Sequence, residues 1–136
     1  MATYNKFQCF VEDICEKKHN LGSDTLKVAL SNASNAPSAS ADVKLADITT
    51  VSTTNLDSVT LTVSSSSQTS GTYKLVLADK TMTASGAVGP FQYVIIYNDT
   101  ASNKELICWY DYGSEVTLAN GDTFKLDFGT ELFSLA

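Results

Sequence analysis

The stretch EVTLANGDTFKLDF, residues 115–128, decides the fold class of this chain. Apolar side chains alternate with polar or small ones on both sides of Asn120-Gly121. Alternation with a period of two is typical of a strand with one buried face, and Asn-Gly accepts the positive φ angles of a tight turn. The stretch therefore predicts a β-hairpin.

Similar alternation recurs along most of the chain and predicts about seven or eight strands. The two most apolar runs, residues 91–99 and 105–112, are expected to form a central hairpin that is buried on both faces. The run SSSSQTSG, residues 64–71, is expected to be a flexible tip. Further strands are expected at 25–31, 44–52, 58–64 and 72–85, with a last short strand within 131–136. The pattern predicts a mainly β chain, folded as an antiparallel β-sandwich or jelly-roll-like domain.

The N-terminal residues 5–19 follow a different period. Their apolar side chains recur at the spacing of one face of a helix: Phe7, Phe10, Val11 and Ile14. This spacing predicts one amphipathic helix, whose apolar face must be buried in this domain or against a neighbouring protein. We expect residues 1–22 to form an N-terminal helical segment and residues 23–136 to form a single β-sandwich domain.

These four helical side chains are the candidate partner interface. If they dock on a neighbour, Phe10→Asp should abolish binding and leave the β-domain folded.

The chain has 136 residues, which fits one domain, and only 18% of them are charged. It contains 16 Ser and 16 Thr residues, a composition that suits a protein packed against neighbours, because charged groups are costly to desolvate.

The charge balance argues against a nucleic-acid partner. Nine Lys and Arg residues stand against 15 Asp and Glu, giving a net charge of −6. Nucleic-acid affinity depends mainly on basic contacts to phosphates.

The start MATYNKFQCF lacks a charged region followed by an apolar run, so we expect synthesis in a cytoplasm without a signal peptide. No run approaches the ~18 apolar residues of a membrane span, and no membrane partner is expected.

The sequence holds no recognisable catalytic, metal or cofactor motif. The single histidine, His19, lies at the expected end of the helix, and the three cysteines, Cys9, Cys15 and Cys108, have no zinc-ligand spacing. Asp111 offers a carboxylate within an aromatic run, but its spacing from other acids is not specific for glycoside hydrolysis. We expect no catalytic residue, no metal and no cofactor.

Aromatic residues gather in the expected central hairpin. Core packing explains such a cluster by default. The alternative is that Trp109, Tyr110 and Tyr112 form a surface aromatic platform that binds sugar.

Several stretches together resemble one family. They are HNLGSDTLKVALSNA, LADIT, SSSQTSGTYKLVLAD, TASGAVGPFQYVIIYNDT, ELICWYDYG and VTLANGDTF. In this order, over nearly the whole chain, they resemble small structural proteins encoded by tailed bacteriophages near the capsid genes. The resemblance implies a capsid decoration, or cement, protein that binds the major capsid protein on the exterior of the virion and braces the shell. It implies no catalytic residue, and a homo-oligomer is expected, with a trimer suited to the local symmetry axes of a capsid.

Three functions remain open from the sequence. The first is capsid decoration, with a tail or neck component as the alternative position in the virion. The second is a module that binds carbohydrate on the host surface. The third is a small hydrolase, which would have to depend on Asp111 or His19.

Overall fold

A computed structural model describes residues 2–136. The chain is mainly β, with 47% of its residues in strands and 10% in helices. The strands are β1 (Thr3–Lys6), β2 (Leu26–Ser31), β3 (Val63–Thr69), β4 (Thr72–Leu77), β5 (Lys80–Thr83), β6 (Val88–Asn98), β7 (Leu106–Leu118), β8 (Thr123–Leu126) and β9 (Phe133–Leu135). Helix α1 spans Cys9–Cys15, and two 3-10 helices, η1 and η2, span Ala33–Asn35 and Leu45–Asp47. The predicted class, an antiparallel β-sandwich with one helix, is confirmed.

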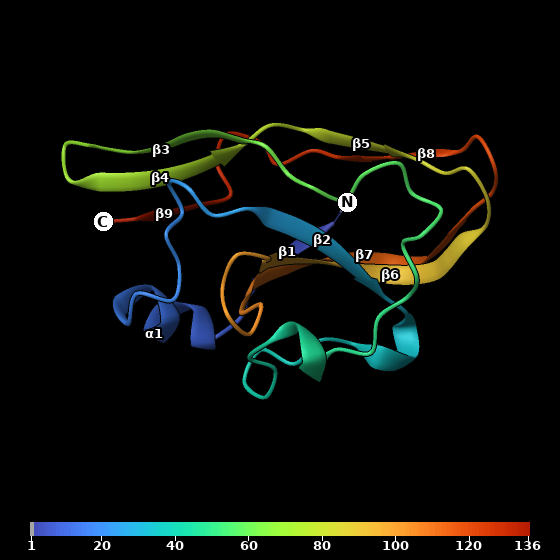
Figure 1. Cartoon of the computed structure of the whole chain (residues 1–136), viewed down its shortest axis with the longest axis horizontal. Coiled ribbons are helices and arrows are strands. Elements are labelled where there is room, and N and C mark those ends of the chain that lie inside the picture. Colours follow the sequence, from blue (N-terminus) through green and yellow to red (C-terminus); the bar gives the residue numbers. More distant parts are fainter. Residues whose placement is uncertain (1) are drawn as a thin grey trace.

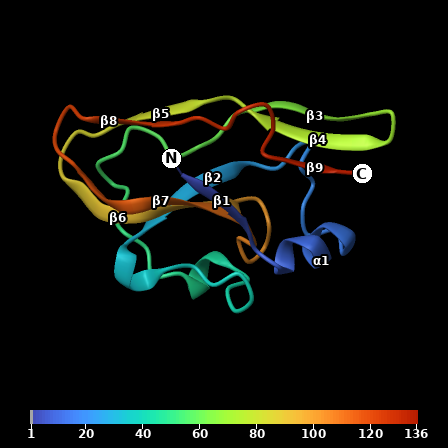
Figure 2. The same cartoon turned by 180° about the vertical axis from the view of Figure 1, so that it is seen from behind.

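The strands lie in two facing layers (Figures 1 and 2). One layer is a four-stranded sheet in the order β1-β7-β6-β2. The other contains a three-stranded sheet, β3-β4-β9, and a two-stranded sheet, β5-β8. The segment from η1 to η2 lies on the far side of the four-stranded sheet, whereas helix α1 lies beyond one end of that sheet, opposite the β3-β4-β9 sheet. The central sheet is therefore covered on both faces.

Two apolar cores follow from this layering. The larger one fills the space between the strand layers and includes Phe91, Val94 and Ile96. The smaller one lies on the other face of the central sheet, where Ile95 and Trp109 pack with Ile48 of the covering segment. Successive side chains of β6 thus alternate between the two cores, as expected for a strand buried on both faces.

The helix is shorter than predicted. It begins at Cys9, and the residues before it form β1, which pairs antiparallel with β7 from Thr3↔Asp111 to Lys6↔Cys108. The helical period is misleading here because Phe7 is buried in the smaller core and Phe10 in the larger one, so the two do not share one docking face. No helix within residues 2–136 is long and apolar enough to cross a membrane.

The hairpin predicted around Asn120-Gly121 is wrong. A turn forms there, with Gly121 at φ +91, but the two arms do not pair with each other. The first arm belongs to β7 and pairs with β6, whereas the second arm is β8 and pairs with β5. The turn therefore connects the two layers of the sandwich. Alternation predicted both strands, but it carries no information about which strand is the partner.

Other local predictions also differ from the structure. The Ser-rich run expected to be a flexible tip forms most of β3, which pairs with β4. Residues 44–52 and 58–64, expected as strands, form η2 and isolated bridges apart from the first residues of β3. The strand expected over 72–85 divides into β4 and β5 on either side of Asp79.

Candidate functional site

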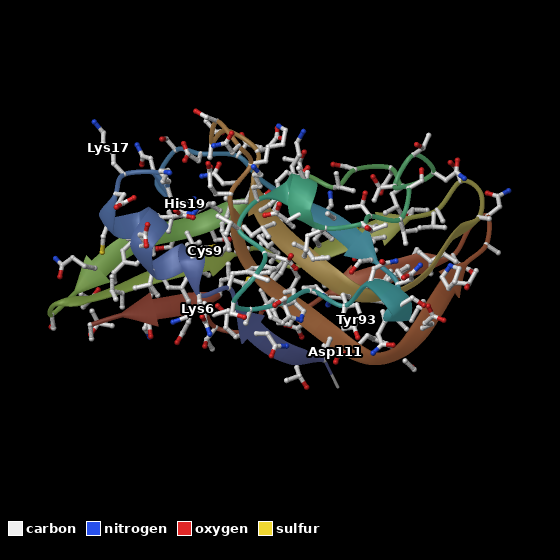
Figure 3. The ribbon with its side chains drawn as sticks, turned by 90° about the horizontal axis from the view of Figure 1, so that it is seen from below. Lys6, Cys9, Lys17, His19, Tyr93 and Asp111 are labelled. Atoms are coloured by element: carbon white, nitrogen blue, oxygen red, sulfur yellow. The ribbon has the colours of Figure 1, made fainter. Side chains whose placement is uncertain are left out.

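An apolar groove lies between β1, α1 and β9. It has a volume of about 420 Å³. Three of the five large apolar side chains that are exposed within residues 2–136 line it: Tyr4, Val11 and Leu135, which are 37%, 51% and 55% exposed. Among the described residues that line it, Lys6 is the only charged one. We call this surface the β1–α1–β9 groove, and Figure 3 shows helix α1 and the labelled Lys6 beside the last strand.

The groove retains part of the predicted helical interface. Val11 is exposed and Ile14 is half-buried, and both line the groove. Phe7 is 0% and Phe10 2% exposed, so these two rings belong to the cores of this chain and are not available to a partner. The expectation that Phe10→Asp would leave the domain folded is therefore corrected, because the substitution would place a carboxylate inside an apolar core.

Sequence reasoning missed Tyr4 and Leu135. They come from opposite ends of the chain, in β1 and β9, and line one groove only after both strands have joined their sheets. Alternation in β9 suggests that one face of that strand is exposed, but it does not show that residues of β1 line the same groove.

The residues of the predicted aromatic platform lie on opposite faces of the central sheet. Trp109 is buried in the smaller core, 4.6 Å from Phe7 between ring centroids. Tyr110 and Tyr112 project from the opposite face of β7. They line a pocket of about 590 Å³ together with Tyr4 and two phenylalanines, Phe124 and Phe128.

The rings of this aromatic pocket contact one another in tilted or edge-on pairs. The centroids of Tyr4 and Tyr110 are 5.5 Å apart, and those of Tyr112 and Phe124 are also 5.5 Å apart. Burial raises the pKa of Tyr4 and of Tyr110 well above the usual range, so both hydroxyls stay protonated and can donate hydrogen bonds. The charged side chains in its lining are Lys125, Asp127 and Glu131.

A buried polar cluster lies where the helix meets the loop between β6 and β7. Asn98 donates from Nδ2 to His19 Nδ1 over 2.9 Å and to Asp24 Oδ2 over 2.7 Å. Its Oδ1 accepts the backbone N–H groups of Thr100 and Ala101. Both polar atoms of this amide are therefore bonded, and the network ties the segment after α1 to the end of β6. A cavity of about 980 Å³ opens beside it.

Two buried carboxyl groups extend the cluster. Asp13 and Glu105 are 5% and 3% exposed, and Asp13 Oδ2, Glu105 Oε2 and His19 Nε2 make no hydrogen bond within the described residues. Burial raises the pKa of Asp13 and lowers the pKa of His19, because each loses hydration of its charged form. In residues 2–136 no three His, Cys, Asp or Glu side chains are grouped so as to hold a metal ion.

The side chains considered for hydrolysis have other partners. His19 makes its side-chain hydrogen bond to an amide, not to a hydroxyl or thiol, in the described part of the chain. Asp111 accepts hydrogen bonds from Gln92 and from the backbone of Gly113. The thiol of Cys108 is buried, and burial raises the pKa of the Cys9 thiol to about 11, so neither supplies a thiolate at neutral pH.

Comparisons of the chain with protein-family models, with curated proteins and with solved structures find no match. The described residues offer three candidate sites: one exposed apolar groove, one aromatic pocket and one buried polar network.

Proposed function

We propose that this chain is a non-enzymatic structural protein of a tailed-bacteriophage virion, and that it is a capsid decoration protein which binds and stabilises the major capsid shell. The resemblance of six stretches in sequence order supports the assignment to a phage structural protein. The β-sandwich supports it further, because two packed strand layers with an apolar core between them give a rigid plate.

The observation that carries the docking step is the β1–α1–β9 groove. Tyr4, Val11 and Leu135, three of the five exposed large apolar side chains within residues 2–136, lie together in this groove. Exposed apolar patches of this kind mark protein interaction sites, and the centres of such sites are depleted in charge. The occupant that we propose is an apolar surface of the major capsid protein.

Charge supports an exterior position. The net charge of −6 opposes contact with packaged nucleic acid, which is itself negative. All nine basic residues are lysines, so the chain has no arginine that could form bidentate hydrogen bonds to a phosphate group. A shell-facing apolar groove and an acidic remainder are compatible with binding to the outside of a capsid.

Co-sedimentation with emptied, undecorated phage shells tests the proposal. We expect saturable binding at a fixed number of sites for each shell, and shells that resist heating better after binding. Absence of shell binding, together with labelling of tails or of the bacterial surface, would contradict decoration and would assign the chain to the tail, the neck or host recognition.

The aromatic pocket favours a second candidate, a host-surface carbohydrate-binding module. Aromatic rings with nearby hydroxyl and carboxylate groups, as at Tyr110, Tyr112 and Asp127, suit the mixed apolar and polar faces of a sugar. Binding of the intact chain to host polysaccharide, lost in Tyr112→Ala and retained in Val43→Ala, would support this candidate. Val43 is a suitable control because it is exposed and does not line the pocket.

A further inference from the structure

The edge strands of the described sheets differ in how they are protected against pairing with another chain. Six strands form sheet edges. Four of them contain a lysine: Lys6 in β1, Lys27 in β2, Lys80 in β5 and Lys125 in β8. Lysine on an edge strand opposes the approach of a second strand, because the charge would have to be desolvated. Another edge, β9, is only 3 residues long.

The remaining edge, β3, has neither of these protections over residues 65–69, and its one irregularity is a register shift between Val63 and Ser65. Its seven residues, VSSSSQT, include no charged residue and no proline. The strand pairs only with β4, so its other edge is open within residues 2–136. Figures 1 and 2 show β3 on the outer side of a hairpin that extends beyond the rest of the molecule. Most of the β3 side chains are exposed.

The register identifies which backbone groups face outward. Thr69 and Thr72 are paired across a two-residue turn, with Ser70 at φ +52 and Gly71 at φ +84. In such a hairpin the residues that flank the turn form a hydrogen-bonded pair, and bonded and non-bonded pairs then alternate. The N–H and C=O groups of Ser66 and Gln68 therefore point away from β4 and are free to bond another strand.

We propose that β3 pairs antiparallel with β3 of a second copy of this chain, which joins two three-stranded sheets into one continuous sheet across a two-fold axis. A two-fold axis places the same edge on both subunits. The pairing is self-complementary because an uncharged edge meets an uncharged edge, so no charged side chain of β3 has to be desolvated.

The pairing also places hydroxyl groups opposite one another. If the two-fold axis passes through the Ser66 pair, Ser65 of one copy lies opposite Ser67 of the other. Both side chains are exposed and point to the outer face of the hairpin, the face of Lys74 and Val76. Cross-strand hydroxyl pairs of this kind stabilise antiparallel sheets. This interface is separate from the β1–α1–β9 groove, and the proposal does not depend on a role in the virion. It makes the homo-oligomer a two-fold dimer instead of the trimer expected from the symmetry axes of a capsid.

Sedimentation equilibrium on charge variants of β3 tests the pairing. Ser65→Lys with Ser67→Lys places like charges across the two-fold axis, and we expect the dimer dissociation constant to rise at least about tenfold. Ser65→Glu with Ser67→Glu should have the same effect. A mixture of the lysine and glutamate variants should recover dimers, because opposite charges then meet. Ser102→Lys with Ser114→Lys, at two exposed sites outside β3, is the matched control and should dimerise like the unmodified chain.

Two outcomes would overturn the proposal. One is an unmodified chain that stays monomeric up to about 1 mM, above the dissociation constants of specific weak dimers. The other is a lysine variant of β3 that dimerises as strongly as its control. Circular dichroism and thermal unfolding of each variant test whether the domain is folded, and a loss of dimer in a folded variant is assigned to the β3 edge.

Discussion

Asn98 donates a hydrogen bond from Nδ2 to Nδ1 of His19 over 2.9 Å. The bond requires the imidazole Nδ1 to act as an acceptor, so His19 is neutral when the network is intact. The residue is 8% exposed, and burial lowers the pKa of its imidazole below the ordinary value. Asp13, Glu105 and Asp24 act in the opposite direction, and Lys18 adds to the lowering, but desolvation is the largest cause.

This relationship makes stability depend on pH. Because the pKa of His19 is lower in the folded chain, the unfolded chain binds the proton more readily as the pH falls through about 6.5. The free energy of unfolding is therefore highest above pH 6.5 and should fall by up to about 1.4 kcal/mol for each pH unit until the folded pKa is reached. Urea unfolding between pH 7.5 and pH 5.5 measures the change.

His19→Gln is the control for that dependence. His19 is the only histidine in the chain, whereas the raised pKa of Asp13 gives a slope of the opposite sign. The variant should therefore be less stable at pH 7.5 and should lose the fall in stability as the pH decreases through this window. An unchanged slope in His19→Gln would show that another group causes the effect.

Substitutions at two adjacent positions of helix α1, Phe10 and Val11, should change the free energy of unfolding by very different amounts. Phe10 is 2% exposed and contacts the Phe133 ring at a centroid distance of 5.0 Å, whereas its neighbour Val11 is 51% exposed. Phe10→Ala should lower the free energy of unfolding by about 3–5 kcal/mol, because it removes a buried ring and leaves a cavity. Val11→Asp should change it by less than about 0.5 kcal/mol. Equal losses in chemical denaturation would contradict the orientation of α1.

Gly89 and Gly113 form a second matched pair. Both have positive φ angles, +108 and +89, so alanine is strained at either position. A Cβ on Gly89 would lie 2.6 Å from the backbone oxygen of Val116, whereas a Cβ on Gly113 would meet no atom within 4 Å. Gly113→Ala should cost about 1–2 kcal/mol, and Gly89→Ala should cost at least about 2 kcal/mol more. Thermal unfolding of the two variants measures the difference, and equal costs would contradict the close approach of β6 and β7.

The sequence predicted the strands better than their partners. Alternation located β2, the paired strands β6 and β7 and the final strand β9, because burial of one or both faces leaves a regular pattern. It assigned the arms around Asn120-Gly121 to each other, whereas they pair with β6 and β5. Pairing depends on contacts between residues far apart in the chain, and the alternation within one strand does not identify its partner strand.

For the candidate sites too, the local sequence pattern did not show which side chains are exposed. Val11 was predicted as an interface residue and is exposed, but Phe7 and Phe10 fit the same helical period and are buried. Exposure depends on which neighbour covers each side chain. Trp109 and Tyr110 are adjacent in sequence and point to opposite faces of β7. Trp109 therefore packs in the smaller core, whereas Tyr110 lines the aromatic pocket.

The most direct test of the account compares shell binding by Leu135→Asp and Val43→Asp. Both side chains are exposed, 55% and 42%, but only Leu135 lines the β1–α1–β9 groove. A carboxylate in the lining of the groove would have to be desolvated on docking. Quantitative co-sedimentation with undecorated shells should therefore show occupancy by Leu135→Asp reduced at least about tenfold, while Val43→Asp binds like the unmodified chain. Full decoration by Leu135→Asp would contradict the groove as the shell-binding surface.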